Sequence, residues 1–229
     1  MDAYFSHIFD FVCLAFSLAL FLGYNLYIGR KLKTNPLYTI QGVSETARRE
    51  WAAGVMRAGD GILAVQTLRN STMVASFMAS TSTLLALGVL SLSAQAEHVA
   101  ETWHVLNLVG AASQGMLMIK ILALMLDLFF AFFCFSSSIR LYNHVGFMIN
   151  TCDGSVAEDV KIAFVTAHLN SAAHQFHTGM RAFYFMVPLV FWVFGSVLLI
   201  LSTAAMIAVV HILDKTPHAS SALLPRRPS

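Results

Sequence analysis

Charged residues are scarce in this sequence. Only 11% of its 229 residues are Asp, Glu, Lys or Arg, whereas 57% are hydrophobic, and the mean hydropathy is +0.69. A soluble domain has roughly 25% charged residues, because its whole surface faces water. Most of this chain must therefore face lipid. The net charge is only +2, so there is no broad basic surface for a nucleic acid, and no nucleic-acid partner is expected.

The usual signatures of catalysis and metal binding are also missing. The three cysteines form no CxxC pair, and the chain contains no GxSxG, P-loop, HExxH or dinucleotide-binding motif. The cysteines are therefore interpreted as inert buried thiols. The sequence predicts a protein that is not an enzyme. No cofactor is predicted, although bound phospholipid is expected.

Long apolar runs dominate the chain instead. About 20 apolar residues are needed for a helix to cross a bilayer, and four segments meet this need: about 8–28, 71–92, 115–139 and 182–212. The sequence thus predicts an all-α, integral membrane four-helix bundle with short amphipathic cytoplasmic helices in its long loops. Residues 1–212 form one four-span membrane domain in this interpretation, and 213–229 form a polar C-terminal tail.

Basic residues are distributed unevenly between the loops. The loop between the second and third spans and the N-terminal segment have none, whereas the other two loops have ten: Arg30, Lys31, Lys33, Arg48, Arg49, Arg57, Arg69, Arg140, Lys161 and Arg181. Loops rich in Lys and Arg stay in the cytoplasm. We therefore expect a bacterial inner membrane protein with both termini on the periplasmic side. The basic residues of the tail, Lys215, Arg226 and Arg227, oppose this orientation.

Polar residues at the cytoplasmic ends of three spans suggest a shared site. We expect them to converge on one layer: Arg69, Asn70, Arg140, Asn143 and Arg181. These side chains could simply anchor the helices at the membrane surface. Alternatively, the arginines could bind an anion or a lipid headgroup, because a guanidinium group matches phosphate and carboxylate.

A second polar layer is expected near the middle of the membrane. Ser80, Ser82 and Thr83 lie midway along the second span, and Asp127 lies midway along the antiparallel third span. We expect Asp127 to contact at least one of these hydroxyls, because lipid offers a carboxyl group no partner. The layer could serve helix packing, or a proton or ion path. Lys120 is expected to extend outward and away from Asp127.

Two sets of histidines are weak candidates for a metal site. His98, Glu101 and His104 recur at every third position in the outer loop, and His174 and His177 are three positions apart near the inner face. Imidazole is a common metal ligand. Neither set forms a complete ligand shell by itself.

Three stretches resemble a family of uncharacterised four-helix membrane proteins found in plants and bacteria, catalogued as a domain of unknown function. They are ILAVQTLRNSTMVASFMASTS, IKILALMLDLFFAFFCFSSSIRLYN and GMRAFYFMVPLVFWVFG. The residues that match the family pattern are Gln66, Arg69, Asn70, Lys120, Arg140, Asn143, Gly179, Arg181, Tyr184, Trp192 and Gly195. Asp127 departs from that pattern. The resemblance implies the four-helix architecture and no known activity.

Three kinds of function fit these observations. The first is a non-catalytic accessory or scaffold subunit of a larger inner-membrane complex, with membrane lipids and other membrane protein subunits as partners. The second is a small oligomeric channel or transporter for an ion or anionic solute. The third is a metal- or lipid-dependent membrane enzyme, for which only the histidines argue.

Overall fold

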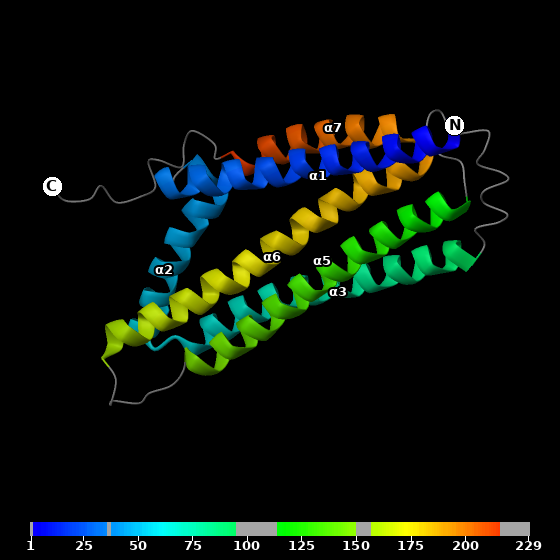
Figure 1. The fold of residues 1–229 in the computed structure, drawn as a ribbon. Helices are drawn as coiled ribbons and strands as arrows, with labels where there is room; N and C mark the ends of the chain where they lie inside the picture. The colour runs from blue at the N-terminus through cyan, green and yellow to red at the C-terminus, as the bar shows by residue number, and fades with distance from the viewer. Residues whose placement is uncertain (1, 36–37, 95–113, 150–156, 216–229) are drawn as a thin grey trace.

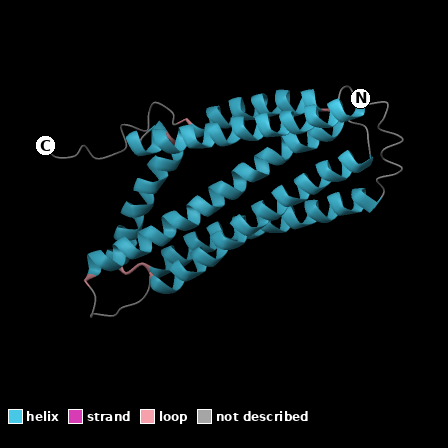
Figure 2. Ribbon diagram, in the orientation of Figure 1, coloured by secondary structure: helices cyan, strands magenta, loops and turns pink. Residues whose placement is uncertain are grey.

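The structure, a computed structural model, describes residues 2–35, 38–94, 114–149 and 157–215. These residues fold entirely into helices and short connections (Figure 2). The helices are α1 (Asp2–Thr34), α2 (Ile40–Ala58), α3 (Gly61–Ala94), α5 (Gln114–Met148), α6 (Glu158–Phe194) and α7 (Ser196–Asp214). The all-α fold class is confirmed.

The helices lie in two layers (Figure 1). In the first layer, α3, α5 and α6 pack side by side and antiparallel. In the second layer, α1 and α7 run side by side and cover the last part of α6. The shorter α2 connects the end of α1 to the start of α3 and packs on the first half of α6. The predicted amphipathic loop helix is therefore α2, and its buried residues Ala52 and Val55 belong to a cluster with α5 and α6.

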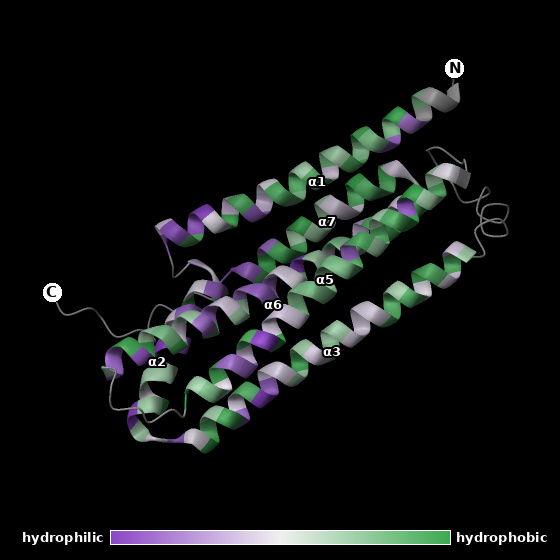
Figure 3. Cartoon of the chain, turned by 60° about the horizontal axis from the view of Figure 1, so that its bottom comes forward, coloured by the Kyte–Doolittle hydropathy of each residue, from purple (hydrophilic) through white to green (hydrophobic). Residues whose placement is uncertain are grey.

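Four helices are long and apolar enough to cross a membrane, so the chain is a multi-pass membrane protein. They cover His7–Thr34, Gly61–Ala94, Gly115–Met148 and Ser196–Asp214. The first three contain the first three predicted spans. Polar residues gather at the end of the bundle where α1 meets α2, and apolar residues cover the long helices (Figure 3).

The prediction of one continuous span over 182–212 is wrong. The helical backbone is interrupted at Gly195 (φ 159°, ψ 150°), and the chain then reverses its direction. Residues 182–194 complete α6, and α7 returns beside it as a separate helix. A continuous helix of 31 residues would have been about 46 Å long, far more than a bilayer core of about 30 Å requires.

This reversal also changes where the chain ends. Lys215 forms an isolated bridge with Thr39, which precedes α2. Asp2, at the start of α1, lies at the opposite end of the bundle (Figure 1). The two ends of the described chain therefore lie at opposite ends of the bundle, whereas the distribution of basic residues in the sequence predicts both termini on one side. The tail beyond Lys215 lies outside the described residues.

Candidate functional site

A cavity of about 450 Å³ lies between α1 and the neighbouring helices α5 and α6. Its walls are mostly apolar. A few polar side chains also line it: Asn25, Gln41, Asp127, His174, His177, Thr178 and Arg181. Ligand sites typically have this size and this mixture of apolar walls with a few polar groups. This cavity is therefore the candidate functional site.

The cavity exists because α1 packs mainly on α7. Few contacts join α1 to α5 or α6. The polar contacts from α1 to the rest of the bundle lie at two levels. Near the start of α1, Asp10 pairs with Lys120 of α5. Near its end, Tyr24 and Asn25 contact Asp214 and Arg181.

Arg181 is the centre of the second of these contacts. Its guanidinium group donates to the side-chain oxygen of Asn25 on α1 and lies 3.1 Å from Oδ2 of Asp214 on α7. Tyr24 Oη donates to the same carboxylate oxygen at 3.0 Å. Four side chains thus join α1, α6 and α7 on one side of the cavity.

The predicted layer of three arginines is wrong. Ala182 belongs to a cluster with Ala131, and Gly179 lies against Phe135. Arg181 is therefore level with residues 131–135 of α5, which is about 8–13 Å along that helix from Arg140. The other members of the predicted site are exposed and are not brought to Arg181: Arg69, Asn70, Arg140 and Asn143.

Asp127 has the predicted depth but the opposite orientation. Ala79 of α3 shares a buried cluster with Ala131 of α5, and Ala86 of α3 shares one with Leu124 of α5. Asp127 lies between Leu124 and Ala131, and Thr83 lies between Ala79 and Ala86. The two residues are therefore at similar depth. However, Asp127 lines the cavity on the side of α1 and α6.

The hydroxyls expected to bind Asp127 are satisfied elsewhere or exposed. Ser82 and Thr83 donate to carbonyl oxygens of their own helix at 2.9 Å and 3.1 Å, and Ser80 is exposed. The predicted contact between Asp127 and this group is therefore wrong. Oδ2 of Asp127 is buried and has no hydrogen-bond partner among the described residues.

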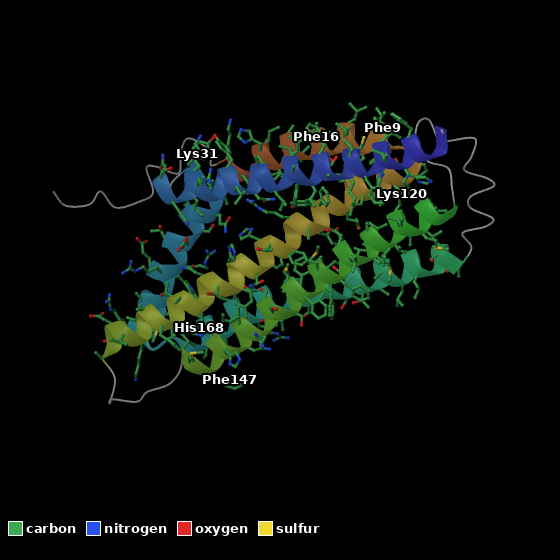
Figure 4. The ribbon with its side chains drawn as sticks, in the orientation of Figure 1. Phe9, Phe16, Lys31, Lys120, Phe147 and His168 are labelled. Atoms are coloured by element: carbon green, nitrogen blue, oxygen red, sulfur yellow. The ribbon has the colours of Figure 1, made fainter. Side chains whose placement is uncertain are left out.

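Lys120 is buried and paired, contrary to the expectation that it extends outward. Its side chain is 2% exposed, and Nζ lies 3.9 Å from Oδ2 of Asp10, which is fully buried. Nζ also lies 5.6 Å from the centre of the Trp192 ring. Figure 4 places Lys120 in the half of the bundle where α1 begins.

Sequence reasoning missed three of these polar residues. Asp10, Asn25 and Asp214 lie at or near the ends of predicted spans, where polar groups are ordinary. One signal was available for Asp10. The spacing of Asp10, Cys13, Ser17 and Phe21 follows one face of a helix, and all four are buried.

The buried charges do not balance within the bundle. Lys120 is paired with Asp10, and Arg181 is paired with Asp214. Asp127 forms no ion pair with the described residues. The cavity therefore has one carboxyl group without a basic partner.

The histidine sets have different outcomes. His98, Glu101 and His104 lie outside the described residues. His174 and His177 both line the cavity, as their spacing allows. No group of three His, Cys, Asp or Glu side chains in the described part of the chain is arranged to hold a metal ion.

A second, smaller cavity continues the first toward α2. It has a volume of about 310 Å³ and shares Leu32, Gln41 and His174 with the main cavity. Its polar wall joins α2 to α6, because Arg48 Nε donates to Asn170 Oδ1 at 2.8 Å. We call this second cavity the vestibule. It lies beside the main cavity, on the side of α2.

His177 should make the stability of the fold depend on pH. Burial, and then the guanidinium groups of Arg48 and Arg181, lower the pKa of His177. The unfolded chain, in which the pKa of histidine is about 6.5, then binds a proton more readily than the folded protein does. The folded state is therefore favoured above about pH 6.5, and this contribution to stability is lost as the pH falls below that value. We therefore expect His177 to lower the unfolding temperature in detergent as the pH falls from about 7.5 to about 5.5, measured as the difference between the parent protein and His177→Gln.

Replacing His177 with glutamine should reduce this dependence on pH. The matched control is His144→Gln, because His144 is exposed on α5. An equal dependence on pH in the parent protein and in His177→Gln would contradict the prediction.

Comparison with known proteins gives one match. A family model described as "Protein of unknown function, DUF599" matches residues 12–219. No curated protein and no solved structure matches the chain.

Proposed function

The chain belongs to the DUF599 family of proteins of unknown function, and we propose that it is a small, non-catalytic membrane protein that binds and carries a solute. The observation that supports this proposal is the cavity between α1 and α6. It combines apolar walls with a cluster of ionisable side chains.

The vestibule provides a way into the cavity. It is polar at Glu45, Arg48 and Asn170, and it lies beside α2, away from the apolar part of the bundle. A solute can reach His174 from this side and then pass His177 toward Asp127. We propose that the solute enters and leaves at the α2 end.

We further propose that this end faces the cytoplasm of a bacterium whose inner membrane contains the protein. The basic residues of the loop around α2 support this orientation. The N-terminus is then periplasmic. Lys215 lies at the cytoplasmic end, so the basic tail residues Arg226 and Arg227 no longer oppose the orientation.

Cysteine labelling tests both the cavity and its orientation. Ala182 is 6% exposed and lines the cavity, so Ala182→Cys in a background lacking Cys152 should react with a membrane-impermeant thiol reagent. We expect labelling in inverted membrane vesicles and none in intact cells. Labelling in intact cells alone would contradict the orientation.

Two further variants control this experiment. Ala131 is fully buried in the same cluster as Ala182 but does not line the cavity, so Ala131→Cys should remain unlabelled. Gly29 lines the cavity, and a Cβ atom there meets nothing within 4 Å. Gly29→Trp should therefore fill the cavity and reduce labelling of Ala182→Cys. Equal labelling of Ala131→Cys and Ala182→Cys would contradict the proposed cavity.

An accessory or scaffold subunit is the second candidate function. Ser80 and Thr83 support it, because both are exposed near the middle of α3, where lipid would otherwise surround them. Small hydroxylated residues at this depth are typical of helix–helix contacts in membranes. Purification in a mild detergent should then retain a membrane partner at fixed stoichiometry, and Ser80→Trp should release it.

A further inference from the structure

We propose that the cavity binds an organic cation with an apolar body, whose positive group pairs with Asp127 and exchanges there with a proton. This inference rests on the proposed solute-carrying function and names the class of solute. It depends on the charges around the cavity, on its aromatic walls and on the orientation of Asp127.

The charges around Asp127 favour a cation. From α1 and α2, the polar groups that line the cavity are the uncharged side chains of Asn25 and Gln41. From α6 come His174, His177 and Arg181. Arg181 already has a carboxylate partner in Asp214, at 3.1 Å.

The lysine on the same helix as Asp127 is also engaged. Lys120 lies two turns away and pairs with Asp10. Neither of these two buried or half-buried cations, Lys120 and Arg181, is therefore left to balance the charge of Asp127. A bound cation or a proton supplies that balance, because an isolated carboxylate is costly inside a membrane protein.

An anionic solute fits the cavity less well. Its natural partner would be the guanidinium group of Arg181, which is already bonded to Asn25 and Asp214. An anionic solute would have to displace the carboxylate of Asp214, which the polypeptide chain holds next to Arg181. It would also be repelled by Asp127 in its ionised form.

Aromatic rings complete the site. Phe21, Phe130 and Phe185 line the cavity from three different helices. Phe21 and Phe185 are stacked, with their ring centres 4.7 Å apart. The face of an aromatic ring attracts a cation, and this attraction is stronger away from water. The rings also provide an apolar surface for the body of the solute.

Exchange with a proton follows from the position of Asp127. One carboxyl group can hold either a proton or a cationic group, so binding of one releases the other and the charge of the cavity is conserved. Acidification should therefore release the cation. His174 and His177 also line the cavity, so their contribution has to be separated from that of Asp127.

Binding of benzyltrimethylammonium tests the proposal. The full chain is purified in detergent, and binding of the labelled cation is measured by equilibrium dialysis between about pH 5 and pH 9. Benzylsulfonate, an anion of similar size and shape, is the matched ligand. We expect the cation to bind more tightly as the pH rises, and benzylsulfonate to bind at least about tenfold more weakly than the cation.

Variants identify the group responsible. Asp127→Asn should weaken cation binding at least about tenfold, and Asp127→Glu should retain it. Asp159→Asn is the control, because Asp159 is a carboxylate of the same chain that is 89% exposed. His177→Gln should keep the increase of binding with pH, because Asp127 remains.

Protection from labelling provides a measurement that does not depend on folding of the Asp127 variants. Benzyltrimethylammonium should slow the labelling of Ala182→Cys, and benzylsulfonate should not. Unchanged cation binding in Asp127→Asn, tighter binding of benzylsulfonate, or no protection at all would overturn the inference. If Ala182→Cys is labelled but no cation binds, the cavity function remains and only the cation assignment fails. If Ala182→Cys is not labelled, the proposed function itself fails.

Discussion

Replacing Lys120 with methionine is expected to destabilise the fold by about 3–5 kcal/mol. Lys120 and Asp10 are 2% and 0% exposed, and their charged atoms lie 3.9 Å apart. Removing the ammonium group takes away the ion pair that Asp10 makes with Lys120 inside the bundle. The cost is large because the carboxylate cannot reach water, and it includes the attraction between Nζ and the ring of Trp192.

Reversible unfolding in mixed detergent micelles measures this effect. Lys33→Met is the control, because Lys33 is exposed in the last turn of α1, and its free energy of unfolding should be nearly unchanged. The double variant Asp10→Leu with Lys120→Met should regain much of the loss, because two apolar side chains replace a buried ion pair at little cost. A loss below about 1 kcal/mol in Lys120→Met would show that the pair is not buried as described.

Gly179→Ala is expected to destabilise the fold by about 1–3 kcal/mol. A Cβ atom at this position would lie 2.8 Å from Cε1 and 3.0 Å from Cδ1 of Phe135, and 3.1 Å from Cβ of Cys134. The ring of Phe135 is fully buried and packs against Phe176, so it has little room to move. Helices α5 and α6 must therefore separate slightly to admit the methyl group.

The matched control is Gly54→Ala on α2. A Cβ atom there meets nothing within 4 Å, so the substitution adds no steric conflict. Alanine favours the helix over glycine by about 1 kcal/mol, and Gly54→Ala should be neutral or stabilising. The same unfolding assay compares the two variants. If Gly179→Ala and Gly54→Ala stabilise the protein equally, the contact between α5 and α6 at Gly179 has room for a methyl group, and the prediction is wrong.

The orientations of Asp127 and Lys120 could not be predicted from the sequence, and the reason is physical. An amphipathic helix reveals its buried face by the periodicity of its apolar residues. In α5 the residues around Asp127 are apolar on every side, because one face meets lipid and the other meets protein. Counting residues therefore placed Asp127 and Thr83 at the same depth, as observed. It could not show whether the two side chains face each other.

The sequence by itself determined the helical class, the membrane setting and the approximate position of the first three apolar spans, because length and hydropathy alone decide whether a helix can cross a bilayer. It also placed His174 and His177 on one side of a helix, since three residues are nearly one turn. Only the tertiary structure decided the reversal at Gly195, because an apolar run over 182–212 is compatible with one long helix or with two shorter ones. The pairs Asp10–Lys120 and Arg181–Asp214, and the charge of Asp127 that they leave unbalanced, join residues more than 30 positions apart. Such pairs depend on which helices become neighbours, and packing of apolar surfaces on α1, α5, α6 and α7 decides that.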